Sequence, residues 1–284
     1  MSSPLPKKKL TRIEERHLSP YHHIHLLNGF SFRKDRSVFY KYMPLDRFKR
    51  SVKDGVFVFV SPDLWQDPFE RMYFNVDCSA HGYQTEEIAC LCVSEKSSTN
   101  EDASWKVYAD NGGKVVRLSI DRILFLDMMD DYANKNGYEV YIGKAQYGYE
   151  KLEIMNLFKP GSPGHDLFFP IKMERKHYLS VMTLKRSAFE YENEFRVFLV
   201  KDSIPYEGPG LVKVPCDYKL SEIIKDIVLS PYPALPRNPV KANPIRERNE
   251  KDSDKQKRIL TKLVGCRVRQ SRLYESGAKV VKVL

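Results

Sequence analysis

Long hydrophobic runs are missing from this sequence of 284 residues. No stretch approaches the roughly 18 consecutive apolar residues that cross a lipid bilayer, so no membrane-spanning segment is predicted. The first nine residues include three lysines with no apolar segment behind them, which does not fit a secretory signal. We therefore expect a cytoplasmic protein without a membrane partner.

The common catalytic and nucleotide-binding motifs are missing too. The sequence contains no GxGxxG, no GxxxxGK[ST] loop, no HExxH and no GxSxG. The Rossmann, P-loop, zinc-protease and α/β-hydrolase classes therefore lack support. Gly112-Gly113 is interpreted as a turn. Any function must rest on residues that are dispersed along the chain.

Cysteine and histidine are scarce and poorly spaced for a metal site. The five cysteines lie at positions 78, 90, 92, 216 and 266, and none forms a CxxC pair. We interpret them as reduced thiols in the core. His22, His23 and His25 include a His-x-His pair, but no neighbouring cysteine or carboxylate completes a ligand set. The sequence therefore predicts a surface segment there and no metal site.

The charge of the chain is unevenly distributed. The net charge of +10 is made up of +8 in residues 1–50, −7 in residues 51–234 and +9 in residues 235–284. Basic ends around an acidic centre can attract a nucleic acid, a nucleotide or an anionic protein partner. Solvated termini on an ordinary globular protein would give the same pattern, and both interpretations stay open.

Amphipathic and alternating patterns predict an α+β fold. Strands are expected at 38–43, 56–60, 88–93, 115–120, 211–214 and 224–229, and helices at 45–54, 103–109, 121–129, 171–186 and 254–264. These elements favour a single domain from residue 37 onward, with a mixed, mostly antiparallel and split sheet and flanking helices. The remaining segments are interpreted as a basic extension (1–36), a charged, proline-rich mobile insertion (231–256) and an edge strand (280–284).

The stretch Phe189–Leu199 is the most unusual in the chain. In a strand, Glu190, Glu192, Glu194 and Arg196 would form one row with neighbours roughly 6.5–7 Å apart. Such a row is either a solvated face or the border of a site that uses carboxylates. A guanidinium can hold a nearby carboxylate bidentately, which favours the second interpretation for Glu192 and Glu194. Glu190 is the member that we expect to be solvated.

An acidic loop and two aromatic pairs complete the candidate residues. The loop at 61–70 carries Asp67 and Glu70, although Asp before Pro is also ordinary turn chemistry. The aromatic pairs, on the predicted strand at 38–43 and helix at 103–109, can pack in the core or wall a ring-bearing ligand. We predict that one cleft is lined by Asp67, Glu70, Trp105, Tyr108, Glu192, Glu194 and Arg196. Tyr40 and Tyr42 share a strand face, from which one hydroxyl can reach a ligand.

Five short motifs follow one another in order: Tyr40-x-Tyr42, Asp67-Pro68-Phe69-Glu70, Ser94-Glu95, Trp105-x-x-Tyr108 and Tyr191-Glu192-x-Glu194-x-Arg196. Over about residues 38–275, this order resembles the bacterial family called domain of unknown function 2971. Gln66 stands where that family usually has Asn, and Phe195 where Trp is commoner. The resemblance implies a fold group and a motif set, and it implies no activity.

The layout is also similar, more distantly, to that of ADP-ribosyltransferases. In that family, aromatic residues sandwich the nicotinamide of NAD, a late-strand Glu contacts the ribose beside the scissile bond, and a preceding acid or Gln orients the acceptor. A fixed carboxylate there stabilises oxocarbenium charge, and basic flanks would help to hold the pyrophosphate. The resemblance implies NAD as substrate, Glu194 and Glu192 as catalytic residues, and Tyr40, Tyr42, Trp105, Tyr108 and Arg196 as cofactor-binding residues.

Three function hypotheses follow. The first is an ADP-ribosyltransferase-like enzyme or NAD glycohydrolase that acts as a toxin or phage-defence effector. The second is a module that binds nucleic acid or protein through its basic ends, with an affinity that falls steeply with salt. The third is a metal-dependent nuclease in which the acidic residues of the predicted cleft bind Mg²⁺. All depend on whether the segments 67–70, 105–108 and 190–196 meet.

Overall fold

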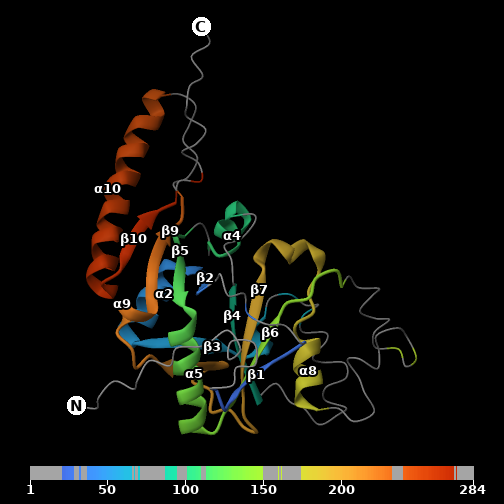
Figure 1. Ribbon diagram of the computed structural model, residues 1–284. Helices are drawn as coiled ribbons and strands as arrows, with labels where there is room; N and C mark the ends of the chain where they lie inside the picture. The colour runs from blue at the N-terminus through green and yellow to red at the C-terminus, as the bar shows by residue number, and fades with distance from the viewer. Residues whose placement is uncertain are drawn as a thin grey trace, which may run out of the picture.

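Ten strands and their flanking helices make up the described part of the chain (Figure 1). The computed structural model describes residues 21–28, 32, 37–65, 67, 70, 87–94, 101–109, 113–149, 159, 161, 174–231, 239–271 and 273. The strands are β1 (Ile24–Leu26), β2 (Val38–Pro44), β3 (Val56–Val60), β4 (Ile88–Ser94), β5 (Val115–Asp121), β6 (Glu139–Lys144), β7 (Glu194–Val200), β8 (Leu211–Pro215), β9 (Ile224–Leu229) and β10 (Arg267–Gln270). The helices are α2 (Leu45–Asp54), α4 (Glu101–Val107), α5 (Arg122–Asn136), α8 (Arg175–Val181), α9 (Leu220–Ile223) and α10 (Pro239–Val264), with short 3₁₀ helices η1 (Pro62–Leu64) and η5 (Ser187–Glu192).

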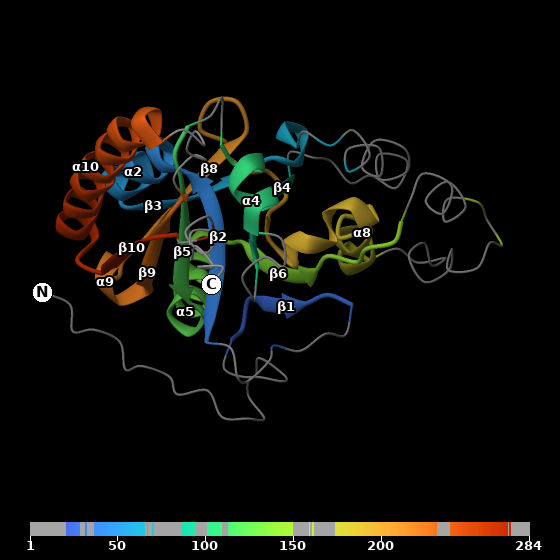
Figure 2. The same ribbon diagram turned by 90° about the horizontal axis from the view of Figure 1, so that it is seen from above.

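All ten described strands hydrogen-bond into one sheet. Its order is β1-β6-β7-β4-β2-β5-β9-β10, with β3 paired to both β4 and β8. The outer pairs, β1 with β6 and β10 with β9, are parallel, and the other described pairs are antiparallel. Figure 2 shows the sheet curving between α10 at one end and α8 at the other. The predicted α+β fold with a mostly antiparallel sheet is confirmed.

The sheet forks at β4. One edge of β4 pairs with β7 along the full length of the strand. On the other edge, Ser94 pairs with Tyr40 of β2, whereas Cys90 pairs with Val60 of β3. Strands β2 and β3 therefore leave β4 at opposite ends, which produces the split that the sequence predicted.

The two faces of the sheet bury different kinds of side chain. One face packs against α2, α5 and the C-terminal half of α10 and holds the main apolar core. The opposite face of β4 and β7 lies under α8 and carries Cys90, Cys92, Glu194, Arg196 and Phe198. Because side chains alternate along a strand, β7 separates the apolar core from its charged residues.

Helix α2 begins and ends where its sequence indicates. Its apolar side chains Leu45 and Phe48 are buried in the core. Gly55 ends it in the left-handed conformation, with φ of 67°, which glycine adopts without a steric penalty. Asp121 caps α5 as predicted, because its Oδ1 accepts a hydrogen bond from the N–H of Leu124 at 3.0 Å.

The folded region begins before residue 37. Strand β1 pairs in parallel with β6, and the segment around it buries four apolar side chains: Tyr21, Ile24, Leu27 and Phe32. The interpretation of residues 1–36 as a basic extension is therefore wrong for residues 21–28 and 32. The charges around these few apolar residues concealed a short strand that completes one edge of the sheet.

The prediction of a mobile insertion at 231–256 is wrong from residue 239 onward, because helix α10 starts there. Arg, Lys and Glu are good helix formers, and their number in this segment outweighs the cost of Pro244 inside the helix. Leu260 and Val264 fix the C-terminal half of α10 in the core. The N-terminal half projects past the ends of the strands (Figure 1).

Two further expectations concern residues that the structure does not describe. The predicted edge strand at 280–284 and the thiol of Cys78 lie outside the described ranges. The four described cysteines are free, at positions 90, 92, 216 and 266. Among the helices in the described ranges, none combines the length and the apolar character that crossing a membrane requires.

Candidate functional site

Lys185 lies at the centre of a buried charge network. Its Nζ is 2.5 Å from Oε2 of Glu194, 2.6 Å from Oε2 of Glu192 and 3.3 Å from Oε1 of Glu70. The lysine side chain is 6% exposed, and the most exposed of the three glutamates, Glu192, reaches only 13%. Three of the predicted acidic residues therefore meet, and they meet around a lysine that the sequence analysis did not include.

Arg196 is the second cation of the network. Its Nε donates to Oε1 of Glu194 at 2.7 Å, and its Nη2 is 2.9 Å from Oε1 of Glu70. Its Nη1 donates to the carbonyl of Met182, and its guanidinium carbon lies 4.3 Å from the ring centroid of Trp65. The side chain is only 1% exposed. The structure therefore makes Arg196 a support for the carboxylates, and Arg196 is not among the residues that line the small cavity beside them.

Asp67 belongs to a neighbouring ion pair. Its Oδ2 accepts hydrogen bonds from Nη2 and Nε of Arg186 at 3.1 and 3.3 Å. The guanidinium of Arg186 and the ammonium of Lys185 each lie 5.1 Å from the ring centroid of Phe189. Asp67 thus fixes the outer side of the network and contributes no carboxylate to its centre.

Lys185 reaches the carboxylates because the chain turns after α8. The predicted helix at 171–186 is wrong at its C-terminal end, since α8 stops at Val181. The hydroxyl of Thr183 donates back to the carbonyl of Ser180 at 2.7 Å, a bond that competes with helix continuation. The following segment pairs with Gln146, whose N–H donates to the carbonyl of Thr183 at 2.9 Å and whose carbonyl accepts from the N–H of Lys185 at 2.8 Å.

Glu192 and Glu194 reach the same lysine because the backbone changes direction between them. Strand β7 begins at Glu194, so the predicted strand is wrong over residues 189–193, which form η5 and a left-handed turn at Asn193. Asn193 has φ of 46° and ψ of 47°, a conformation that asparagine tolerates better than most residues. Glu190 is exposed on η5, as expected for the solvated member of the row.

A small cavity lies beside the two carboxylates. It is lined by strands β2 and β4, the end of α4 and the start of β7: Tyr40, Lys41, Tyr42, Cys92, Val93, Ser94, Ser104, Tyr108, Glu192 and Glu194. Its volume of about 20 Å³ is enough for about one water molecule. The hydroxyl and carboxylate groups in its wall can bind water or the polar groups of a substrate.

The predicted aromatic residues divide into two roles. Tyr40, Tyr42 and Tyr108 line the cavity. Trp105 lies behind them, only 4% exposed, with its ring centroid 5.0 Å from that of Tyr42. It packs in a small apolar cluster with Val115, so it fixes Tyr42 rather than facing the cavity.

The two cavity carboxylates have pKa values that are displaced in opposite directions. Burial and the charge of Glu194 raise the pKa of Glu192 to about 7, against the opposing effect of Lys185. Burial alone would raise the pKa of Glu194 too, but Lys185 and Arg196 outweigh burial and hold it well below its usual value. The network contains three carboxylates and two cations, so protonation of Glu192 makes it electrically neutral.

Tyr108 and Lys185 keep their protons beside these carboxylates. Burial and the charges of Glu192 and Glu194 raise the pKa of Tyr108 well above its usual value, so its hydroxyl is a donor at neutral pH. Burial would lower the pKa of Lys185, but the glutamates around it, Glu194 most strongly, raise it well above the usual value. The site thus presents a charged lysine, one firmly ionised carboxylate and one carboxyl group that titrates near neutrality.

Lys185 also bears on metal binding. Its ammonium occupies the place that a divalent cation shared by Glu70, Glu192 and Glu194 would take. Within the described ranges, no group of three His, Cys, Asp or Glu side chains is arranged to hold a metal ion.

The histidine segment does have a neighbouring carboxylate, which the local sequence did not reveal. The strand pairing brings the carboxylate of Glu139 to 3.3 Å from His23 Nδ1 and 2.7 Å from His25 Nε2.

Sequence reasoning missed Lys185, Trp65 and Tyr147. In the predicted helix at 171–186, Lys185 would lie in the last turn, where basic residues are common. Tyr147 fixes the start of β7, because its hydroxyl accepts a hydrogen bond from the N–H of Glu194 at 2.9 Å. One signal pointed to the lysine: Arg196 alone could not balance three buried carboxylates, so a second cation was needed.

The turn that carries Lys185 packs closely on Gly143 of β6. A Cβ added there would lie 2.5 Å from Cγ2 of Thr183 and 3.1 Å from Cδ1 of Leu27. We expect Gly143→Ala to lower the free energy of unfolding in urea by about 1–3 kcal/mol. Adding Thr183→Ser removes the clashing methyl group and keeps the hydroxyl, so the double variant should recover part of the loss. An unchanged unfolding midpoint in Gly143→Ala would contradict this packing.

Comparison with known proteins gives no relative from which a function can be transferred. No protein-family model, curated protein or solved structure matches the chain. The functional interpretation therefore rests on the geometry and electrostatics of the site.

Proposed function

We propose that this chain is an NAD-consuming enzyme that cleaves the bond between nicotinamide and ribose, with Glu192 as the reacting carboxylate. One observation carries the proposal: two adjacent carboxyl groups, with pKa values displaced in opposite directions, line a tyrosine-walled cavity. Such displaced pairs are typical of sites where one group exchanges protons and the other stays ionised. The similarity of the sequence layout to ADP-ribosyltransferases supports the same chemistry, and we retain the resemblance to the 2971 family as part of the proposal.

The chemistry fits the groups that are present. When the C1′–N bond breaks, its electron pair neutralises the positively charged nicotinamide nitrogen, so the leaving group needs no proton. Positive charge develops on the ribose, where a fixed carboxylate stabilises it. Water or an acceptor hydroxyl then forms the new bond to C1′ and gives its proton to a base. A carboxylate with a pKa of about 7 is well matched to accept that proton near neutral pH.

Glu192 is better placed for this role than Glu194. Both oxygens of Glu194 are occupied, Oε1 by Arg196 and Oε2 by Lys185. Glu192 accepts a hydrogen bond from Lys185 through Oε2 alone among the contacts described here, and this difference decides between two residues that the sequence pattern left equivalent. In this proposal Glu194 is a positioning residue, since its negative charge raises the pKa of Glu192.

The size of the cavity adds a condition. Its volume of about 20 Å³ suits the attacking water, whereas a nicotinamide ring needs more space. NAD binding must therefore displace part of the wall, and Tyr108 follows directly on the short helix α4. The chain has two tryptophans, one stacked on Arg196 and the other packed against Tyr42, so intrinsic fluorescence reports this rearrangement without an added probe.

The test is release of nicotinamide from NAD by the purified protein, measured by chromatography with water and with varied acceptors. We expect release by the wild type and a decrease of about 100-fold in Glu192→Gln, the lower range for removal of a general base. Glu190→Gln is the matched control, because that residue is exposed on the same 3₁₀ helix, and it should keep full activity. The proposal is overturned by a wild type that releases no nicotinamide, or by equal release from Glu192→Gln.

A further inference from the structure

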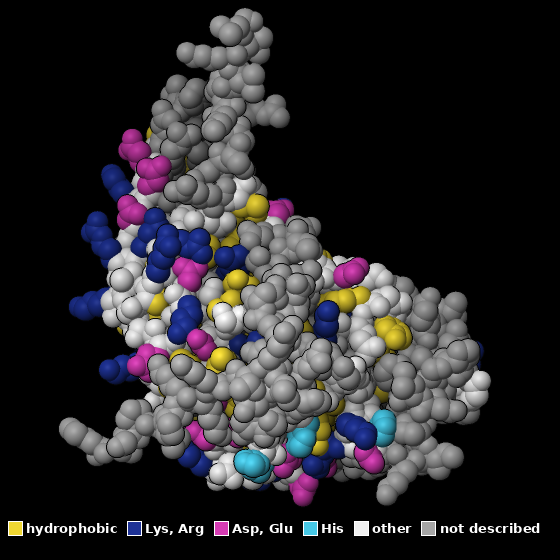
Figure 3. Space-filling view, viewed as in Figure 1, with side chains coloured by type: hydrophobic (Ala, Val, Ile, Leu, Met, Phe, Trp, Pro, Cys, Tyr) yellow, Lys and Arg dark blue, Asp and Glu magenta, His cyan; other side chains and the backbone are white. Residues whose placement is uncertain are grey.

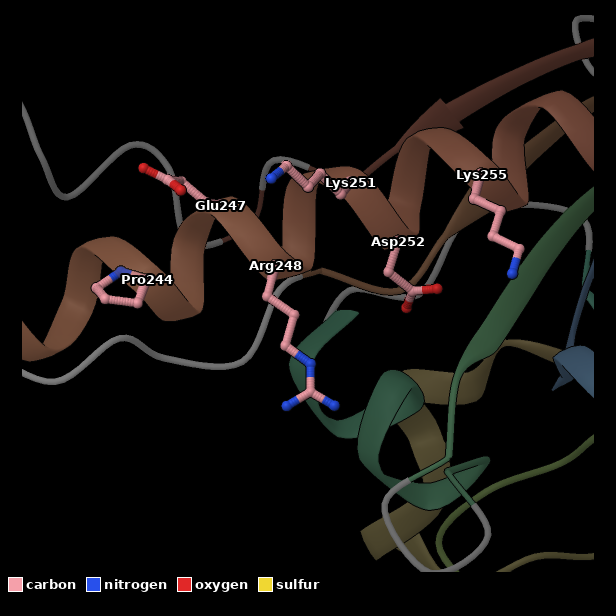
Figure 4. A pocket seen from close by; sticks show the side chains of 6 residues that line it. All are labelled: Pro244, Glu247, Arg248, Lys251, Asp252 and Lys255. Carbon is pink, nitrogen blue, oxygen red and sulfur yellow. The ribbon is translucent and has the colours of Figure 1, made fainter.

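A groove runs along α10, and Figure 4 shows Arg248, Asp252 and Lys255 on the side of the helix nearer α4 and Glu247 and Lys251 on its other edge. Its volume is about 490 Å³, and it is lined by Pro244, Glu247, Arg248, Lys251, Asp252 and Lys255. Figure 4 shows the guanidinium of Arg248 extending from the helix toward α4. The groove is therefore a separate feature from the carboxylate cavity, and three of its six lining side chains are cationic.

These three cations are not neutralised by neighbouring acids. Arg248, Lys251 and Lys255 have no ion-pair partner in the part of the chain that the structure describes. Asp252 pairs instead with Lys114, at the start of β5. Glu247 is the one acid left among the described lining residues, so the groove keeps a net positive charge.

The spacing of the cations makes them a linear array. Positions 248, 251 and 255 are three and four residues apart, which places them on one side of the helix. They span about 10 Å along the helix axis at 1.5 Å per residue. A row of cations at this spacing can contact successive phosphates of an extended polyanion.

The opposite side of α10 holds the helix in place. Leu260 and Val264 are buried in the core, Ser253 donates to Oε1 of Gln270 at 2.6 Å, and Lys49 of α2 donates to Gln256 at 2.9 Å. A helix that lies on a membrane must expose an apolar face, whereas among the described side chains of α10 only two large apolar ones are exposed, Ile245 and Leu263, which lie towards opposite ends of the helix. This arrangement favours an aqueous polyanion over a lipid surface.

Basic side chains continue from the groove across the adjoining strands. Figure 3 shows Lys and Arg gathered along α10 and over the neighbouring part of the sheet. Strand register puts Tyr42, Arg117, Val228 and Arg269 in one row on one face. The guanidinium of Arg117 lies 5.3 Å from the ring centroid of Tyr40, which also lines the carboxylate cavity. Arg117 thus lies on the sheet face that carries that cavity, whereas Arg269 in the same row is paired with Asp226.

We propose that this groove binds the phosphate backbone of a nucleic acid. The named lining residues include no aromatic ring on which a base could stack, so recognition is through phosphates and independent of base sequence. This binding site stands apart from the NAD reaction: loss of nicotinamide release would leave it intact, and loss of nucleic-acid binding would leave the reaction chemistry intact.

The experiment measures anisotropy of fluorescently labelled single-stranded and duplex DNA of about 20 nucleotides over a series of salt concentrations. The wild type should bind with an affinity that falls steeply with salt. A triple variant that combines Arg248→Gln, Lys251→Gln and Lys255→Gln loses three phosphate contacts. It should bind about 100-fold more weakly at roughly 0.1 M salt. The slope of log K against log salt should become shallower by about 2 for the single strand and by nearly 3 for the duplex.

A matched control removes the same charge elsewhere. The control is a triple variant that combines Lys135→Gln, Lys144→Gln and Lys176→Gln, which removes three exposed cations from α5, β6 and α8. It should change the affinity for DNA by no more than about twofold. Circular dichroism checks that both triple variants are folded. Equal loss in the two variants, absence of wild-type binding at low salt, or binding to phosphatidylserine vesicles but not to DNA would each overturn the proposal.

Discussion

Replacing Lys185 with methionine is expected to lower the free energy of unfolding by about 3–5 kcal/mol. The methionine keeps the length of the side chain and removes the charge, so Glu70, Glu192 and Glu194 lose the cation that they share. Arg196 alone would then face three buried carboxylates. Urea denaturation near neutral pH, followed by circular dichroism, measures the change.

The control for this variant is Lys176→Met on α8. That lysine pairs with Glu174 at the surface and is 60% exposed, so its loss should cost at most about 1 kcal/mol. Adding Glu192→Gln to Lys185→Met removes one of the unbalanced charges and should restore about 1–2 kcal/mol. If Lys185→Met is no less stable than Lys176→Met, the buried network does not have the energetic role described here.

The acidic stretch illustrates what sequence periodicity can predict. Glu194 and Arg196 do alternate with apolar residues on a strand, as the pattern indicated, and both are buried on one face. The pattern could not show that the strand starts at Glu194, because that depends on Asn193 adopting a left-handed conformation. Without that turn, Glu192 and Glu194 would not share one lysine.

Contacts between distant segments could be predicted only in part. The three segments singled out from the sequence do converge: Tyr108 and Glu194 line one cavity, and Glu70 joins the network behind it. Lys185 escaped prediction because its position depends on a turn fixed by Gln146, a pairing between segments 39 residues apart that local propensity does not encode. The charged segment of α10 was misinterpreted for the opposite reason, since its composition was read as disorder and its helix propensity was overlooked.

Stability should also depend on pH through Glu192. Its pKa is about 7 in the folded chain and near 4.5 when unfolded, so the folded state holds the proton more tightly. Stabilisation from this proton is fully present below about pH 4.5 and is lost as the pH rises to 7. The difference between the folded and unfolded pKa values of Glu192 corresponds to about 3 kcal/mol in the free energy of unfolding. The titratable groups that interact with Glu192 include Lys185, Glu194, Tyr108, Tyr147 and Tyr191, and their displaced pKa values keep them in one protonation state over this range.

Glu192→Gln should therefore remove this dependence, because glutamine imitates the protonated carboxyl group at every pH. We expect the stability of the variant relative to wild type to increase by about 1–3 kcal/mol between pH 5 and pH 8. Subtracting the stability of one protein from that of the other at each pH removes the contributions of the histidines and of the exposed acids, because both proteins contain these groups. Glu190→Gln should show no such trend. If the stabilities of the wild type and Glu192→Gln run parallel from pH 5 to pH 8, Glu192 is already ionised throughout that range. The carboxylate would then lack the near-neutral pKa on which its proposed role as a base depends.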